Sequence, residues 1–179
     1  MRIPRAMRAA AFDRHGGPEV LEVRDVPVPK PGPGEVLVRV EACALNRADL
    51  WVRQGIPGYP VPCPHVGGCD IAGAIASVGE RVASVYAGAE VVVFPAVSCG
   101  VCVACERGET NACAERKIVG FQRPGGFAQY LCVPERNVLP RPKGLDAVRA
   151  AAVPVTFLTA YRMLFSRGAL RGPETVLVT

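Results

Sequence analysis

Short apolar segments recur along the chain and are separated by clusters of glycine and proline. Several of these segments alternate between apolar and polar residues, or are apolar throughout, over the length of a β-strand. The turn clusters lie at 15–18, 29–34, 55–64 and 124–126. The pattern predicts a mainly β fold, either a barrel or a sandwich. Strands are expected at 7–12, 20–26, 35–44, 71–78, 90–94 and 127–133.

Few helices are expected among these strands. Asn46 is a favourable N-cap residue and Asp49 follows three positions later, close to a capping box, so a short helix should begin there. A second, Ala-rich helical region should begin near Asp146 and be split by Pro154. Residues 155–166 then continue as an amphipathic helix that ends at an Arg-Gly stop signal.

The last five residues, 175–179, have the composition of a buried parallel strand and follow a Gly-Pro-Glu turn. A single strand of this kind has no partner in the sequence. We therefore expect the chain to be a piece of a longer protein, in which helices and strands next alternate as a doubly wound domain.

Composition narrows the class of protein. The chain has 179 residues, of which 50% are hydrophobic and 21% charged, which suits a globular domain and excludes disorder, collagen and coiled coil. The net charge of +5 is spread without a basic run, so no nucleic-acid partner is expected. The longest uncharged apolar segment, 91–105, is too short to span a bilayer, so no membrane association is expected. Charged residues interrupt the first 13 positions, so the expected compartment is the cytoplasm.

The eight cysteines must then be explained as thiols or metal ligands before disulfides. Four of them have the spacing Cys99-x2-Cys102-x2-Cys105-x7-Cys113. Four thiolates on one compact loop can enclose one Zn²⁺ in a tetrahedron with no open position, so the zinc should be structural. The alternatives fit less well: an iron–sulfur run has a shorter last gap, and a zinc finger needs paired histidines.

The sequence resembles the medium-chain alcohol dehydrogenase and quinone oxidoreductase superfamily. The resemblance is carried by 26–40, by the glycines of 73–79, by the four-cysteine loop and by 151–161. Residues 15–21 and 44–50 look closer to the quinone oxidoreductase branch than to the zinc alcohol dehydrogenases.

This resemblance implies a GroES-like catalytic domain of partly open barrel form over 1–145, with the structural-zinc loop at 98–114. It also implies that 146–179 form a junction helix and the first strand of a Rossmann domain, which is absent here and would carry NAD(P)H. A small-molecule substrate and a homo-oligomer, dimer or tetramer, are implied as well. The isolated fragment should therefore have little or no activity.

The same resemblance allows the catalytic zinc site of the alcohol dehydrogenases to be tested residue by residue. The first ligand position holds Asn46, and the neighbouring proton-relay hydroxyl is replaced by Ala48. The second position, in a Gly-His-Glu motif, holds Cys69, and the third holds Val155. One possible ligand of three does not make a catalytic zinc site.

The other cysteines and the histidine near this region have simpler interpretations. Cys43 lies three residues before the ligand position at Asn46, so it does not match that position. A buried cysteine usually acts as a small hydrophobe, and Cys43, Cys63 and Cys132 are interpreted in this way. His65 is expected in a turn, either solvated or locally hydrogen-bonded.

Without catalytic zinc, the expected activity is NAD(P)H-dependent reduction of quinones or α,β-unsaturated carbonyls, whose conjugation already makes the acceptor carbon electrophilic. Two alternatives remain: an alcohol dehydrogenase with an altered metal site built from Cys43, Cys69 and Asp70, and a non-enzymatic zinc-stabilised GroES-like module.

The candidate site residues are six, each with a structural alternative. Asn46 would donate to the acceptor oxygen or cap its helix, and Trp51 would stack on a quinone or face the core. Asp49 and Asp70 would serve as acid/base or orienting groups, or as a cap and a salt-bridge partner. Thr156 and Thr159 would bind the nicotinamide carboxamide or bond back to the preceding helical turn.

Overall fold

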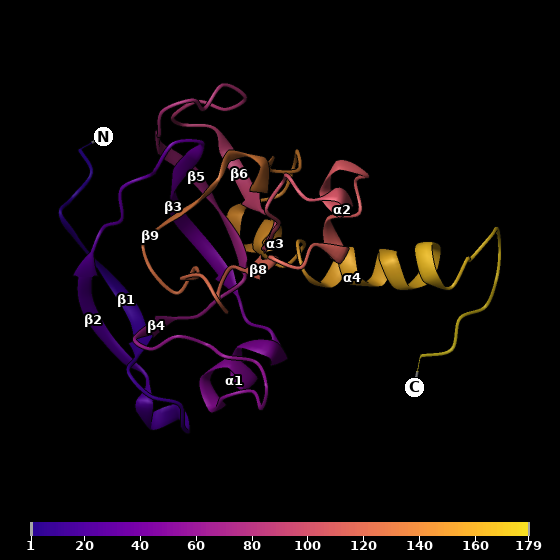
Figure 1. Ribbon diagram of the computed structural model, residues 1–179, viewed down its shortest axis with the longest axis horizontal. Helices are drawn as coiled ribbons and strands as arrows, with labels where there is room; N and C mark the ends of the chain where they lie inside the picture. The colour runs from indigo at the N-terminus through magenta and orange to yellow at the C-terminus, as the bar shows by residue number, and fades with distance from the viewer. Residues whose placement is uncertain (1, 179) are drawn as a thin grey trace.

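The computed structural model of the protein describes residues 2–178 and is built mainly of antiparallel strands (Figure 1). The strands form sheets of order β2-β1-β4, β10-β6-β5-β3-β9 and β7-β8, and the described chain does not close them into a complete barrel. The strands are β1 (Ala6–Phe12), β2 (Glu22–Pro27), β3 (Glu35–Ala44), β4 (His65–Val66), β5 (Asp70–Val78), β6 (Glu90–Val93), β7 (Ala96–Val97), β8 (Lys117–Ile118), β9 (Tyr130–Pro134) and β10 (Val138–Pro140).

The helices are few and short. In Figure 1, α4 and the π-helical turn η4 that continues it extend away from the sheets. No helix in residues 2–178 is long and apolar enough to cross a membrane. The α-helices are α1 (Arg47–Gln54), α2 (Val103–Glu106), α3 (Ala147–Ala151) and α4 (Thr156–Tyr161), and the shorter turns are η1 (Pro18–Val20), η2 (Thr110–Ala112), η3 (Glu135–Asn137) and η4 (Arg162–Arg167).

The six predicted strands are all present, with ends that differ from the prediction by up to three residues. The largest difference is at 127–133, where regular pairing begins only at Tyr130. The short strands β4, β7, β8 and β10 were not predicted, because two or three residues are too few to show a period. Both predicted helical regions are confirmed, and the second is interrupted near Pro154, as expected.

The prediction of a buried strand at the C-terminus is wrong for residues 175–178. They form no regular structure, and Leu177 and Val178 are 84% and 87% exposed. Thr179 lies outside the described residues. A strand needs a hydrogen-bonded neighbour, and the described chain offers none at this point, so sequence composition alone does not produce one.

The core lies on the inner face of the five-stranded sheet, where β-branched side chains alternate inward. Val36, Val38, Ile71, Val93 and Val133 are fully buried there. Gly73 of β5 pairs with Val40 of β3, and a Cβ at Gly73 would lie 2.1 Å from the Arg39 carbonyl oxygen. The absence of a side chain therefore lets β3 and β5 approach closely in the sheet that leads to the candidate site.

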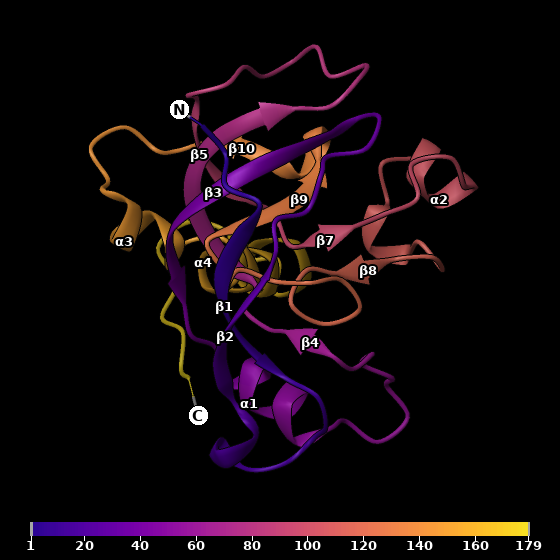
Figure 2. The same ribbon diagram turned by 90° about the vertical axis from the view of Figure 1, so that its left-hand side faces the viewer.

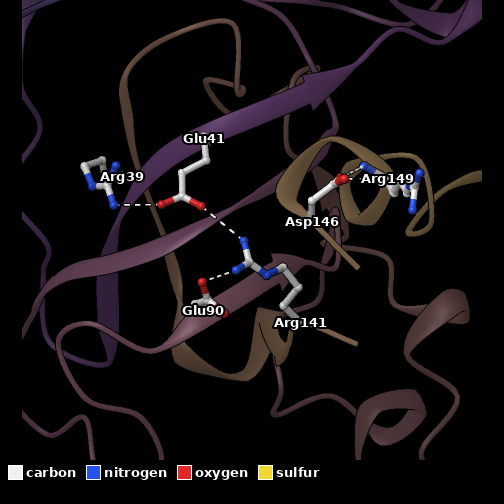
Figure 3. Close-up of polar contacts among 6 residues, drawn as sticks. All are labelled: Arg39, Glu41, Glu90, Arg141, Asp146 and Arg149. Carbon is white, nitrogen blue, oxygen red and sulfur yellow. Dashed lines mark hydrogen bonds and ion pairs between the residues drawn. The ribbon is translucent and has the colours of Figure 1, made fainter. Parts of the chain in front are cut away.

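Charged side chains connect three strands on the outer side of this sheet (Figure 3). Arg141 directly follows β10 and is only 12% exposed, with Nη1 3.1 Å from Glu41 Oε2 on β3 and Nη2 paired with Glu90 on β6. Arg39 pairs with the same Glu41 at 2.7 Å. The network therefore ties the edge strand β10 to the centre of the sheet.

Replacing Arg141 with methionine should lower the free energy of unfolding by about 1 kcal/mol, the upper end for a partly exposed ion pair. The matched control is Arg149→Met, because the Asp146–Arg149 pair is 3.8 Å long and its arginine is 74% exposed. Urea unfolding in low salt measures both variants. Equal stability of the two variants would contradict a role for the Arg141 network.

Candidate metal centre and candidate active site

The four cysteines of the predicted metal loop converge in space. Their Sγ atoms all lie within 4.8 Å of one another, and those of Cys99 and Cys105 are 3.9 Å apart. A tetrahedral zinc site with Zn–S bonds of about 2.3 Å requires sulfur–sulfur distances of roughly 3.8 Å. The sulfurs of Cys99, Cys102, Cys105 and Cys113 can therefore ligate one Zn²⁺ after a small contraction of the loop.

The local backbone prepares these sulfurs to bind a cation. Gly100 has a φ of +82°, which turns the chain so that backbone N–H groups face the Cys99 sulfur. Hydrogen bonds from the backbone of Val101 and Cys102 lower the pKa of Cys99 to about 6. The Cys99 N–H also donates to Cys113 Sγ at 3.4 Å. The backbone thus favours the thiolate form of Cys99, which is the form that ligates zinc.

This cage is closed and lies in a projecting loop. Figure 2 shows the segment with α2 beside β7 and β8, far from α1. All four coordination positions would be filled by protein sulfur, which leaves none for water or substrate. Within residues 2–178, no other group of three or more metal-ligating side chains brings its ligand atoms this close together, so Cys43, Cys69 and Asp70 do not form a second one.

A second polar cluster lies where α1, β5 and the start of α4 meet. Asp70 is 1% exposed and accepts hydrogen bonds from Asn46 Nδ2 and from the Val155 backbone N–H, both at 2.8 Å. The Asn46 amide also points at Cys69 Sγ, 3.7 Å away. Residues 46, 69 and 155, which the sequence resemblance relates to zinc ligands, are therefore connected through hydrogen bonds centred on Asp70.

Both carboxylate oxygens of Asp70 accept hydrogen bonds within the cluster. Asn46 Nδ2 donates to Oδ2 and the Val155 N–H donates to Oδ1. Burial raises the pKa of Cys69 to about 12, so its sulfur is a neutral thiol at neutral pH. Burial also raises the pKa of Asp70. At positions 46, 69 and 155 the structure thus presents an amide N–H donor, a neutral thiol and a backbone N–H.

Asp49 fixes the position of α1 beside this cluster. Its carboxylate accepts from the Asn46 backbone N–H at 2.7 Å and from the Gly68 N–H at 3.2 Å. Burial raises its pKa. Gly68 has a φ of +95°, and a Cβ there would lie 2.8 Å from Cys43 Sγ. The expected cap is thus present, and the same carboxylate also holds the segment that leads into β5.

The remaining candidate residues are more exposed. Trp51 is 50% exposed and lies under the Arg47 guanidinium, 6.0 Å from the ring centroid, so the core-facing alternative is wrong. The Thr156 hydroxyl donates to the Ala152 carbonyl, as its structural alternative predicts. Thr159 and Val155 line a cavity of about 520 Å³ between α4 and the cysteine loop. Thr159 therefore shares a cavity with Val155, whose N–H binds Asp70.

His65 is not in a solvated turn but in β4, where it is 3% exposed. Its Nε2 lies 2.9 Å from the Gly120 carbonyl oxygen, and its ring packs edge-on against Phe12. Burial lowers the pKa of His65, so the ring is neutral and serves the fold. His65 and Gly120 are 55 positions apart in sequence, so the local pattern around His65 did not reveal that the ring is buried.

The other cysteines outside the cage differ in exposure. Cys43 and Cys132 are partly buried, in agreement with their interpretation as small hydrophobes. Cys63 is exposed, so that interpretation is wrong for it: it lies in the proline-rich segment that connects α1 to β4, where little apolar surface covers it.

Comparison with known proteins finds similar sequences among oxidoreductases. The chain is 34% identical over 97% of its length to quinone oxidoreductase of Lama guanicoe and 33% identical over 96% to NAD-dependent alcohol dehydrogenase of Sulfurisphaera tokodaii. These matches cover 45% and 50% of the two relatives, so the chain spans about half of their length.

Solved structures agree with the fold. A crystal structure of an NAD-dependent alcohol dehydrogenase matches with 48% identity and a TM-score of 0.89, over 92% of this chain and 48% of that one. A cobalt- and zinc-bound thermostable alcohol dehydrogenase from Pyrobaculum aerophilum matches with 37% identity and a TM-score of 0.83, over 90% of this chain and 48% of that one.

A protein-family model also matches the sequence. Residues 32–143 match the alcohol dehydrogenase GroES-like domain. With the open antiparallel sheets and the relatives above, this places the chain in a superfamily of oxidoreductases. The chain belongs to the alcohol dehydrogenase GroES-like domain family of the medium-chain dehydrogenase/reductase superfamily.

Proposed function

We propose that the chain is the GroES-like catalytic part of an NAD(P)H-dependent oxidoreductase that reduces quinones or α,β-unsaturated carbonyls without a catalytic zinc. One observation carries this proposal: of the three positions that the resemblance relates to zinc ligands, Asn46 and Val155 direct N–H donors to Asp70 at 2.8 Å each, and Cys69 lies 3.7 Å from the Asn46 amide. Oxidation of a simple alcohol needs a metal or a strong base to manage the alkoxide, and this cluster offers no place for the metal.

Conjugated carbonyls suit the groups that are present. NAD(P)H supplies a hydride to the electron-poor carbon when it is bound. The arriving charge moves to the carbonyl oxygen, where a positioned donor stabilises it, and a proton from water completes the reduction. The Asn46 N–H that faces Cys69 Sγ at 3.7 Å makes only a weak hydrogen bond, so a substrate oxygen would be the better acceptor.

Other residues would position these groups. Asp70 holds the Asn46 side-chain amide. Asp49 accepts from the Asn46 backbone N–H and so holds the start of α1. Thr159 lines the cavity next to Val155 and is the better placed of the two threonines to bind the nicotinamide carboxamide, because the Thr156 hydroxyl is already paired with its own helix. Trp51, in the middle of α1, is half exposed and would offer to a flat substrate the ring face that Arg47 does not cover.

The proposal includes the organisation of the longer protein. Residues 1–145 would form the catalytic domain, with the structural-zinc loop at 98–114, and 146–179 would lead into a cofactor domain that corresponds to the half of the relatives not matched here. Assembly into a dimer or tetramer and a reducing, cytoplasmic location are part of the same proposal. The free cysteines agree with such a compartment.

Substrate turnover by the complete protein that contains this chain tests the proposal. Oxidation of NADH or NADPH is expected with a quinone and with an enone, and it should be unchanged after brief treatment with a chelator that does not remove the structural zinc. Turnover of simple alcohols that depends on added zinc, with no quinone or enone reduction, would contradict the proposal.

Alcohol dehydrogenation is the second candidate function. It is favoured by the 48% identity to a crystal structure of an NAD-dependent alcohol dehydrogenase. The same assays separate the two candidates, because only the second requires oxidation of a saturated alcohol by NAD⁺ or NADP⁺.

A further inference from the structure

Arg136 contacts the metal loop from outside. It belongs to the turn η3 between β9 and β10, and its Nη2 donates to the carbonyl oxygen of Ser98, the residue before Cys99. On the other side of Cys99, a Cβ at Gly100 would lie 2.9 Å from Arg136 Nη1. The guanidinium therefore lies against the backbone on both sides of the first cysteine of the cage.

The turn that carries Arg136 is itself fixed to the body of the domain. Asn137 is 2% exposed, and its Nδ2 donates to the carbonyl oxygens of Phe94 at 2.8 Å and Ala96 at 2.9 Å. These bonds connect η3 to the segment between β6 and β7, which leads directly into the metal loop. The position of Arg136 is thus set by the sheet and not by the cysteines.

Glu135, on the other side of Arg136, holds a different loop. Its carboxylate accepts from the backbone N–H of Ser84 at 2.9 Å and of Ala83 at 3.3 Å. Three successive side chains of one turn therefore hold two segments: Glu135 binds the loop at 83–84, while Arg136 and Asn137 bind the segment at 94–98. Of the three, Arg136 contacts the metal loop next to a cysteine. Glu135, in the same turn, therefore serves as a matched control.

Charge gives Arg136 a second effect on the cage. Four thiolates around one Zn²⁺ carry a net charge of −2, and a fixed guanidinium nearby stabilises that charge. Outer partners that orient metal ligands commonly affect metal affinity by 10- to 100-fold. The contact of Arg136 with the Ser98 carbonyl has the form expected of such a partner.

We propose that Arg136 is a positioning residue of the metal centre: it holds the backbone around Cys99 in the ligating conformation and offsets the negative charge of the thiolate cage. The proposal rests on the assignment of the four cysteines as a zinc site. It predicts that zinc binding depends on a residue more than 20 positions after the last ligand, on a different element of the fold.

Zinc affinity of the full chain, measured by competition with a chromophoric chelator, tests this role. Arg136→Gln should weaken zinc binding by about 10- to 100-fold and speed zinc release. Arg136→Lys should lose about 3- to 10-fold, because a lysine keeps the charge but not the fork of donors. Glu135→Ala, which frees the same turn from the other loop, should stay within about twofold of the unchanged chain.

Cobalt gives a readout that does not depend on activity. The sulfur-to-cobalt absorption of the Co²⁺-loaded chain should fall at lower chelator concentration in Arg136→Gln than in Glu135→Ala. Equal affinity of Arg136→Gln and the unchanged chain would overturn the proposal, as would an equal loss in Glu135→Ala. If Arg136→Gln does not fold, the zinc affinity of Arg136→Lys is compared with that of the unchanged chain, and equal affinity overturns the proposal. An unchanged chain that binds no zinc would instead refute the metal assignment itself.

Discussion

Replacing Cys105 with serine is expected to reduce the zinc content of the purified protein from one ion per chain to near zero. The Cys105 sulfur lies 3.9 Å from that of Cys99 inside a cage whose four sulfurs are mutually within 4.8 Å. A structural zinc site loses its closed tetrahedron when one thiolate is removed, and binding of the metal contributes about 10 kcal/mol or more to the order of such sites.

The loop should lose its order together with the metal. Trypsin is expected to cut the Cys105→Ser chain at Arg107, inside the loop, under conditions in which the zinc-loaded chain is resistant. Cys63→Ser is the matched control, because Cys63 is exposed and outside the cage. Zinc content by elemental analysis and the rate of cleavage are measured on both variants. Retention of zinc by Cys105→Ser would show that the cage is not the metal site.

Replacing Asn46 with alanine is expected to lower kcat for quinone or enone reduction by the complete protein about 100-fold. The reason is the loss of a side-chain donor that faces a weak acceptor, the Cys69 sulfur at 3.7 Å, and is thus available to a substrate oxygen. A donor used mainly in the transition state changes kcat more than KM. The comparison of the two constants separates this role from simple binding.

Leu50→Ala is the control for Asn46→Ala. Leu50 lies on α1 as well, but it is 50% exposed and takes no part in the hydrogen bonds around Asp70. Its replacement should leave kcat within about twofold of the unchanged enzyme. If Asn46→Ala retains full kcat while only its stability falls, Asn46 serves the fold alone.

Several features of the site follow from local sequence. The spacing of the four cysteines predicts a cage, and the sulfurs do converge. The Asn46–Asp49 pair predicts the start of α1, which the structure places at Arg47. These predictions succeed because each depends on residues that are close together in the chain, where spacing restricts the geometry.

Other features depend on contacts between distant segments. Asp70 and Val155 are 85 positions apart, and no pattern in either segment reveals that the N–H of one binds the carboxylate of the other. His65 is buried because Gly120, 55 positions later, accepts its hydrogen bond. The same limit applies to the C-terminal 175–178, whose apolar residues resemble a buried strand but find no neighbour to pair with among residues 2–178.

The Asn46 side chain shows how the structure changes the interpretation of one residue. The sequence offered a helix cap or a substrate donor as its roles. In the structure the backbone N–H of Asn46 takes part in the cap through Asp49, while its side-chain amide is bound to Asp70. One residue thus contributes to the helix start with its backbone and to the polar cluster with its side chain.

The zinc-to-protein ratio of the complete protein, measured by elemental analysis, distinguishes one metal site from two. One closed cysteine cage should bind metal, and the hydrogen-bonded cluster around Asp70 should not. The expected ratio is one, and it should fall to near zero in Cys105→Ser. A ratio of two, with one zinc retained in Cys105→Ser and lost when Cys69 is replaced, would contradict this expectation and favour a metal-dependent alcohol dehydrogenase.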